Sequence, residues 1–176
     1  TAGVSVLSAG SGQPGQGGAG MISFSQGLNL GSNAILVIDG TGTTAGSQYD
    51  QLSVTGAVSI ANCNLQIASL PSVPLGTAFV IINNDGTDPV SVTFNGLPEN
   101  TVLTVSGQPF RIHYAGGTGN DVVLVRDTGA TAPVLGVGVG SYTNGAGRLT
   151  GFGGSLIAYG VQATTNFITW TNIGSA

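Results

Sequence analysis

Hard oxygen ligands are concentrated in two short loops of this 176-residue chain. Residues 83–88 read N-N-D-G-T-D and place Asp85 and Asp88 among amide oxygens, which are ligand types that calcium prefers. Residues 116–123 read G-G-T-G-N-D-V-V and match one copy of a calcium-binding nonapeptide, with Asp121 at the acidic position. The first loop lacks the downstream glutamate of an EF-hand, and the second lacks the tandem copies that share an ion. The sequence therefore makes Asp85, Asp88 and Asp121 candidates for weak calcium binding, with hydrogen-bonded turns as the alternative.

Groups suited to catalysis are few. Asp39 and Asp50 flank a loop rich in Thr, Gly and Ser, and two carboxylates held roughly 5–9 Å apart can hydrolyse glycosides. Nothing in the loop sets that distance, and Asp50 is better placed to bond local backbone groups. His113, the single histidine, has no second His or Cys for a zinc site and no recognisable serine–acid partners. Cys63, the single cysteine, cannot form an intrachain disulfide and is expected in the core. We therefore expect no enzymatic activity, and no cofactor beyond the calcium considered above.

The charge composition restricts the partners of the chain. Its basic residues are Arg111, Arg126 and Arg148, and only 6% of all residues are charged, against about 25% in an ordinary domain. Nucleic acid is excluded because phosphate binding needs clustered Lys and Arg, and the absence of a run of ~18 apolar residues excludes membrane insertion by a helix. We expect at least one arginine to pair with an Asp or with Glu99. A surface of Ser, Thr, Asn and Gln approaches identical copies at little desolvation cost, which favours identical subunits as partners.

Hydrophobic periodicity predicts strands throughout the chain and almost no helix. Apolar and polar residues alternate, as in a sheet with one buried face, over residues 22–24, 28–30, 52–54, 58–60, 65–67, 90–94, 103–105 and 110–114. In the last of these segments, Ile112 is expected on the buried face, and Arg111 and His113 on the polar face. The runs Ile35–Ile38 and Phe79–Ile82 are apolar throughout and predict strands that are covered on both faces.

Turn residues and composition predict a boundary at each end of the main domain. Residues 1–20 are expected to form a short strand followed by a flexible, glycine-rich tether over residues 8–20. Residues 21–127 form the main β-domain, residues 128–132 a linker, and residues 133–176 a small C-terminal β-module. A module of this size is close to the lower limit for independent folding.

The expected fold class is all-β. Short connections between residues 77 and 126 predict antiparallel hairpins. The strand spacing over residues 21–70 is compatible either with the successive rungs of a β-solenoid or with a sandwich. We therefore expect solenoid-like rungs followed by antiparallel hairpins or a sandwich, with a jelly-roll β-sandwich as the alternative.

Most of the chain resembles the C-terminal region of bacterial autotransporter-associated β-strand repeat proteins, which are large, glycine-rich surface or secreted proteins. The blocks that carry the resemblance are residues 47–60 (SQYDQLSVTGAVSI), 76–90 (GTAFVIINNDGTDPV), 93–100 (TFNGLPEN) and 110–124 (FRIHYAGGTGNDVVL). Residues 159–174 (YGVQATTNFITWTNIG) resemble a short immunoglobulin-like module that often follows. The resemblance implies an exported, all-β, partly β-helical protein, and it carries no catalytic residue across. In the family, further strand-forming sequence follows this module, whereas the sequence here stops at Ala176. Either residues follow that are not part of this sequence, or the module is one strand short and leaves an open sheet edge.

These observations lead to a functional hypothesis. We expect a secreted, cell-surface structural subunit of a filament or surface layer, polymerising by strand pairing or donor-strand complementation between subunits. The expected donor strand is Val4, Ser5, Val6 and Leu7, and the expected acceptor edge contains Tyr159, Val161, Phe167 and Trp170. The alternative is an adhesin or carbohydrate-binding module that uses the aromatic residues among these to bind a cell-surface polysaccharide.

Overall fold

The computed structural model describes residues 5–129 and two short strands, 160–163 and 171–175. The chain divides into two compact units, Thr1–Gly129 and Ala130–Ala176, and this division falls inside the expected linker. In the second unit, β11 (Gly160–Ala163) pairs with β12 (Thr171–Ser175) in antiparallel orientation. The rest of the predicted C-terminal module lies outside the described residues.

The first unit is all-β, as the periodicity predicted, and its strands form two sheets that do not close into a barrel. The first sheet is parallel and has the following strands: β1 (Ser5–Gly12), β3 (Leu28–Ile38), β5 (Val58–Ser59) and β6 (Asn64–Ile67). In this sheet β3 is central, with β1 on one side and the short β5 and β6 on the other. A single turn of 3₁₀ helix, η1 (Pro14–Gln16), lies between β1 and β2.

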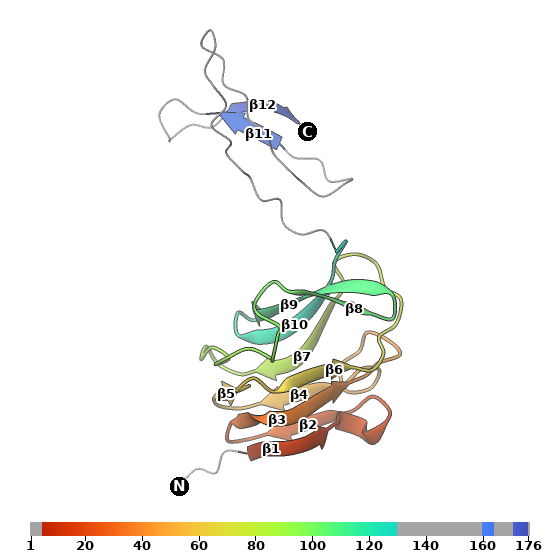
Figure 1. The fold of residues 1–176 in the computed structure, drawn as a ribbon, viewed down its shortest axis with the longest axis vertical. Helices are drawn as coiled ribbons and strands as arrows, with labels where there is room; N and C mark the ends of the chain where they lie inside the picture. Colours follow the sequence, from red (N-terminus) through yellow and green to blue (C-terminus); the bar gives the residue numbers. More distant parts are fainter. Residues whose placement is uncertain (1–4, 130–159, 164–170, 176) are drawn as a thin grey trace. The chain divides into compact units, whose positions relative to one another are not determined.

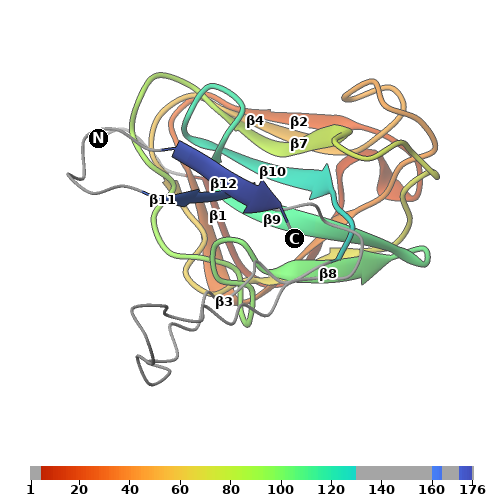
Figure 2. The same ribbon diagram turned by 90° about the horizontal axis from the view of Figure 1, so that it is seen from above.

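The second sheet has six strands in the order β2-β4-β7-β10-β9-β8. Its parallel part contains β2 (Met21–Phe24), β4 (Gln51–Val54) and β7 (Ala78–Asn84), and its antiparallel part contains β10 (Asp121–Arg126), β9 (Gln108–Gly116) and β8 (Val102–Val105). Successive strands of the chain alternate between the two sheets as far as β5, and β6 lies in the first sheet with β5 before the chain returns to the second sheet at β7, so the sheets stack level by level (Figure 1). Viewed along this stack, β2, β4 and β7 lie above one another on one side, and β1 and β3 on another (Figure 2).

From β2 onwards the parallel strands keep a nearly constant register, whereas the partners of β1 in β3 lie only 23 or 24 positions further along the chain. Met21 lies opposite Gln51 and Leu52 opposite Ile82, and each partner is 30 positions further along the chain. In the other sheet, Leu28 lies opposite Val58, again 30 positions further on. Side chains with the same orientation are therefore stacked in columns from one strand to the next.

The inward-facing columns of side chains form the hydrophobic core of the first unit. Leu36 and Ile38 of β3 are at most 2% exposed, whereas Ile35 and Val37 on the other face are only partly buried. The apolar run Ile35–Ile38 is thus covered fully on one face only, because β3 lies in a sheet with one inner face. Cys63 is buried, as expected.

Two expectations about the strands were wrong. The first part of the predicted flexible tether, residues 8–12, instead belongs to β1: Gly10 lies opposite Ala34 and Gly12 opposite Leu36. Backbone N–H and C=O groups make these ladder contacts, so glycine and serine can extend a strand without contributing apolar side chains. The predicted strand over residues 90–94 is reduced to isolated bridges, because Val92 has a φ of 62° and leaves the extended conformation.

Candidate functional site

The two acidic loops meet at the carboxyl end of β7. Asp121, which is 2% exposed, accepts hydrogen bonds from the backbone N–H groups of Asn84 (2.8 Å) and Thr118 (2.8 Å). It also accepts a bond from the Thr118 hydroxyl at 3.0 Å. Both carboxylate oxygens of Asp121 are therefore engaged, and this residue joins β7 to the turn between β9 and β10. The Asp121 carboxylate therefore caps a hydrogen-bonded turn, which was the alternative to calcium binding for the nonapeptide match. It also bonds a second loop, through the N–H of Asn84.

Asp85 and Asp88 occupy the same corner but differ in their surroundings. Asp85 is exposed, and its Oδ1 atom accepts a hydrogen bond from the N–H of Gly56 at 2.6 Å. The side chain of Asn120, which sequence reasoning missed, donates to the carbonyl oxygens of Asp85 (2.8 Å) and Asp88 (3.2 Å). Among residues 5–129, no three Asp, Glu, His or Cys side chains converge in a group that could hold a metal ion. Asp85, Asp88 and Asp121 thus lie in adjoining loops without forming a site of three carboxylates.

The carboxylates of Asp39 and Asp50 accept hydrogen bonds from distant parts of the chain and so connect separate loops. Asp50 is fully buried, and its carboxylate accepts hydrogen bonds from the N–H groups of Gly20 (2.8 Å) and Asp39 (3.0 Å). Burial raises the pKa of Asp50 above its usual value. The Asp39 carboxylate accepts a bond from the Gln13 side chain at 2.7 Å. Asp50 does bond backbone, as the sequence suggested, but its partners are 11 and 30 positions away and not adjacent.

A second polar group surrounds Tyr114 of β9. The phenol donates to the carbonyl oxygen of Leu97 (2.6 Å) and accepts from the N–H of Phe94 (3.0 Å). Burial raises the pKa of Tyr114 to about 12. Glu99 accepts the backbone N–H of Tyr114 at 2.7 Å and contacts Nδ1 of His113 at 2.8 Å. His113 therefore has a carboxylate partner on the polar face of the strand, where the alternation placed it.

The arginines behave as the charge composition predicted. Arg111 forms an ion pair with Asp127, and its guanidinium also donates to the carbonyl oxygen of Asn100 at 2.6 Å. Ile112 between Arg111 and His113 is fully buried, which confirms the predicted alternation of faces. These contacts fasten the end of the first unit to β9, and they involve no recognisable catalytic arrangement.

We expect Tyr114→Phe to destabilise the first unit by about 1–3 kcal/mol, because the N–H of Phe94 loses its acceptor inside the core. The pKa of Tyr114 is higher in the folded state than the ordinary 10, so the folded state binds this proton more tightly. Its contribution to stability is complete below pH 10 and is lost as the pH rises towards 12. Urea unfolding at several pH values should show a shallower alkaline loss for Tyr114→Phe than for the unaltered protein. Equal slopes would contradict this assignment.

The expected donor strand lies within its own subunit. Ser5 lies opposite Leu28, Val6 opposite Asn29 and Leu7 opposite Leu30, so these residues form the start of β1 in the first sheet. Val4 lies outside the described residues, as do Tyr159, Phe167 and Trp170 of the expected acceptor edge. Val161 lies in β11, opposite Gly174 of β12. The structure thus shows an intramolecular edge strand where the sequence analysis placed a strand for donation.

At the N-terminal end of the stack, each sheet ends in a strand that has one unpaired edge. Among the described strands, β1 pairs only with β3, and β2 pairs only with β4. Neither β1 nor β2 contains a charged residue. In one inner column, Ile22 of β2 is 38% exposed, whereas Leu52 and Ile82, which follow it, are at most 3% exposed. Ile22 therefore occupies a core position that no strand among the described residues covers from the outer side.

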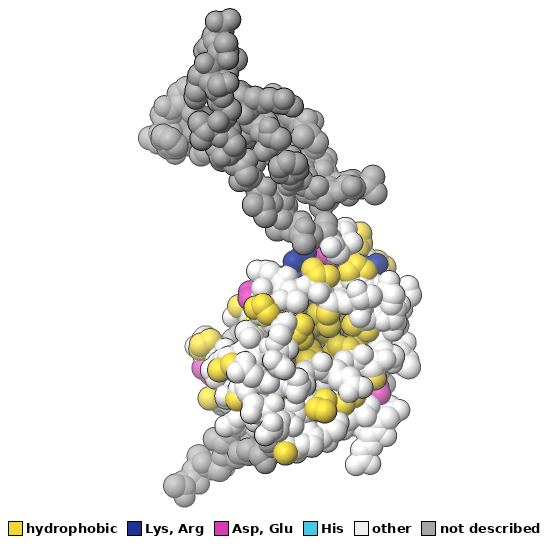
Figure 3. Space-filling view, in the orientation of Figure 1, with side chains coloured by type: hydrophobic (Ala, Val, Ile, Leu, Met, Phe, Trp, Pro, Cys, Tyr) yellow, Lys and Arg dark blue, Asp and Glu magenta, His cyan; other side chains and the backbone are white. Residues whose placement is uncertain are grey.

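The surface of the first unit is poor in charge. In the face shown by Figure 3, charged side chains are few and well separated among uncharged polar and hydrophobic ones. Met21, next to Ile22, is 48% exposed, so the uncovered end presents two large apolar side chains in sequence.

Sequence and structure comparisons give no relative: the chain matches no protein-family model, and no curated protein or solved structure is significantly similar to it. The geometry defines a sandwich-like all-β protein with a polar, hydrogen-bonded corner and open strands at one end of its stack. In the described part of the chain, no helix has the length and apolar character needed to cross a lipid bilayer.

Proposed function

We propose that this chain is a secreted structural subunit of an extracellular filament or surface layer, and that its parallel strands are the rungs of a short β-solenoid. A rung here means one strand in each sheet with the connections between them. The 30-residue register between Met21 and Gln51, repeated between Leu52 and Ile82, supports the solenoid. Parallel pairing is also unlike the antiparallel Greek keys of a jelly roll.

The uncovered N-terminal end carries this proposal. Edge strands of ordinary soluble proteins are protected by charged side chains, proline or bulges. β1 and β2 contain neither charge nor proline, although β1 has one register shift between Leu7 and Ala9. A strand from a second subunit that pairs with β2 would satisfy the free backbone groups of β2. It would also cover Ile22, which would then be buried like Leu52 of β4 and Ile82 of β7 in the same column.

The opposite end of the second sheet supplies a different edge. There the last strand is β8, which pairs only with β9 among the described strands and also lacks charge. Contact between two unlike ends is heterologous, and a heterologous contact that does not close produces an open filament. The scarcity of charge over the whole chain keeps the desolvation cost of such contacts low. The resemblance to exported bacterial repeat proteins agrees with this location and role, and we propose no catalytic activity.

The test compares assembly of the unaltered protein with that of two matched variants. Ile22→Lys places a charge at the uncovered end, while Leu75→Lys changes another exposed apolar residue, 60% exposed, in the loop between β6 and β7. We expect negative-stain electron microscopy and sedimentation to show polymers of the unaltered protein and of Leu75→Lys. Ile22→Lys should remain a folded monomer, with an unchanged far-ultraviolet circular dichroism spectrum, over at least a tenfold range of concentration.

The proposal fails if the unaltered protein remains monodisperse at every concentration tested, or if both variants polymerise equally. A monomer that binds a polysaccharide on a glycan array would instead favour the adhesin alternative.

A further inference from the structure

Two buried oxygen atoms in the loop after β7 have no hydrogen-bond partner in the described part of the chain. They are Oδ1 of Asn84 and Oδ2 of Asp88, four residues apart. Asn84 is 2% exposed. A buried polar oxygen without a partner costs free energy, and a carboxylate oxygen costs more than an amide oxygen. These two atoms therefore need an explanation that the fold alone does not give.

The amide of Asn84 is directed into this loop. Its Nδ2 atom donates to the carbonyl oxygen of Asp88 at 2.8 Å, so the amide group that carries the unpartnered Oδ1 atom contacts the 85–88 segment. Asn120 holds that segment from the other side through the carbonyl oxygens of Asp85 and Asp88. The loop is thus fixed by two amide side chains while one oxygen of each of Asn84 and Asp88 stays unpartnered.

The register shows that Asn84 is an exception in its column. Phe24 lies opposite Val54, and Val54 lies opposite Asn84. An apolar residue at position 84 would continue the column with no unpartnered oxygen. The amide instead brings a hard oxygen ligand to a position beside an acidic loop.

Charge in this corner is negative. Asp85, Asp88 and Asp121 all lie in the two adjoining loops, but Asp85 and Asp121 already accept backbone hydrogen bonds from Gly56 and from Asn84 and Thr118. Asp88 is the one of the three with an oxygen that is both buried and unpartnered. The ligand that fits is a cation, because it would satisfy both oxygens and neutralise the Asp88 carboxylate.

We propose that Asn84 Oδ1 and Asp88 Oδ2 bind one calcium ion, whose remaining positions are filled by water and loop carbonyl oxygens. Calcium accepts six to eight oxygen ligands in irregular geometry, whereas magnesium requires a near-ideal octahedron. With a single carboxylate ligand, the dissociation constant should be about 1 mM, in the range of extracellular calcium modules. The site differs from the one expected from sequence, since Asp85 and Asp121 are not ligands and Asn84 is.

The experiment is thermal unfolding of the full chain in EDTA, in 10 mM CaCl₂ and in 10 mM MgCl₂ at constant ionic strength. We expect calcium to raise Tm by about 5 °C, as binding to the folded state alone requires at ten times the dissociation constant. Magnesium should raise it by much less. Asp88→Asn should lose the calcium shift. Asp85→Asn should keep it, because its amide oxygen still accepts the Gly56 N–H.

The absence of any calcium-dependent shift in the unaltered protein would overturn the proposal, as would an equal shift in Asp88→Asn. A second measurement does not depend on how the variants fold. In a calcium titration followed by NMR, the side-chain amide of Asn84 and the backbone amide of Asp88 should move together, and changes confined to other residues would also overturn it.

Discussion

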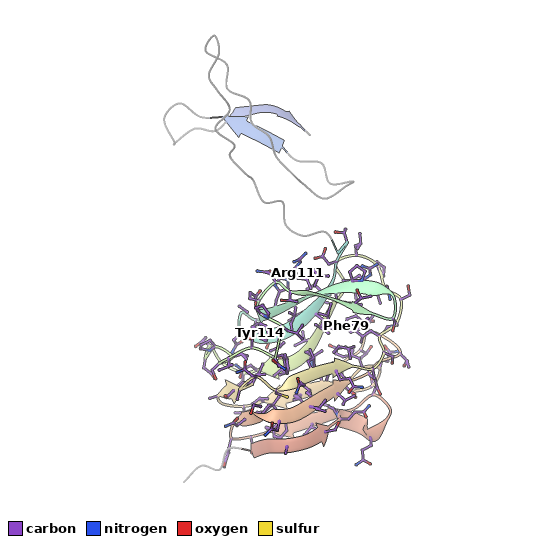
Figure 4. All side chains as sticks on the ribbon, viewed as in Figure 1. Phe79, Arg111 and Tyr114 are labelled. Atoms are coloured by element: carbon purple, nitrogen blue, oxygen red, sulfur yellow. The ribbon has the colours of Figure 1, made fainter. Side chains whose placement is uncertain are left out.

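Replacing Phe79 with alanine is expected to lower the free energy of unfolding of the first unit by about 3–5 kcal/mol. Phe79, labelled in Figure 4, lies in β7 and is fully buried. It makes edge-on contacts with two other rings. The Tyr49 ring centroid is 5.1 Å away and the Phe110 centroid 5.9 Å away. Tyr49 precedes the parallel strand β4, and Phe110 belongs to the antiparallel strand β9. The alanine variant therefore opens a cavity where the parallel and antiparallel parts of the second sheet pack together.

Urea unfolding followed by circular dichroism measures this effect, and Leu75→Ala provides the control. Leu75 is 60% exposed, so its removal should change stability by no more than about 0.5 kcal/mol. A loss below about 1 kcal/mol for Phe79→Ala would mean that the two parts of the sheet are held together elsewhere.

Asp121→Ala is expected to destabilise the first unit by about 3 kcal/mol. The substitution leaves the buried N–H of Asn84 without an acceptor and also removes the acceptor of the Thr118 N–H. Each bond to a charged group contributes about 1.5–3 kcal/mol, so the loss of these two bonds costs about 3 kcal/mol at the lower end of that range.

Chemical denaturation of Asp121→Ala and Asp121→Asn separates the two bonds. The asparagine variant keeps the size of the side chain but only one acceptor oxygen, so its stability should lie between that of the alanine variant and that of the unaltered protein. Hydrogen exchange at the Asn84 amide should accelerate in the alanine variant. If Asp121→Ala unfolds at the same urea concentration as the unaltered protein, this residue does not join the two loops.

Local periodicity was sufficient to locate most strands. The alternation of apolar and polar residues at Ile22–Phe24, Leu52–Val54 and Phe110–Tyr114 corresponds to parts of β2, β4 and β9. It failed at residues 8–12, where a strand forms with Ala9 as its one apolar side chain, and at Val92, where a positive φ interrupts an alternating segment. At residues 8–12 the extended conformation is held by pairing with β3 and does not follow from the local residue types.

The surroundings of the polar side chains were even harder to predict from local sequence than the strands were. The sequence marked Asp85, Asp88 and Asp121 as oxygen ligands, but it offered no sign that Asn84 would be buried. Position 84 follows an apolar run and precedes a turn, so its burial depends on a register with Val54, which is 30 residues earlier. That register would have been the one useful signal, and no strict repeat length is evident in the sequence itself.

The sequence by itself determined that this protein is all-β and poor in charge, because composition and alternation are properties of each segment alone. Only the tertiary structure decided which strands are neighbours and which edges stay open, and it alone showed that Asp50 and Asp121 hold distant loops together. Strand pairing between residues about 30 apart depends on how the backbone turns between the two sheets, and those turns are held by hydrogen bonds between residues far apart in the sequence, which no single segment specifies.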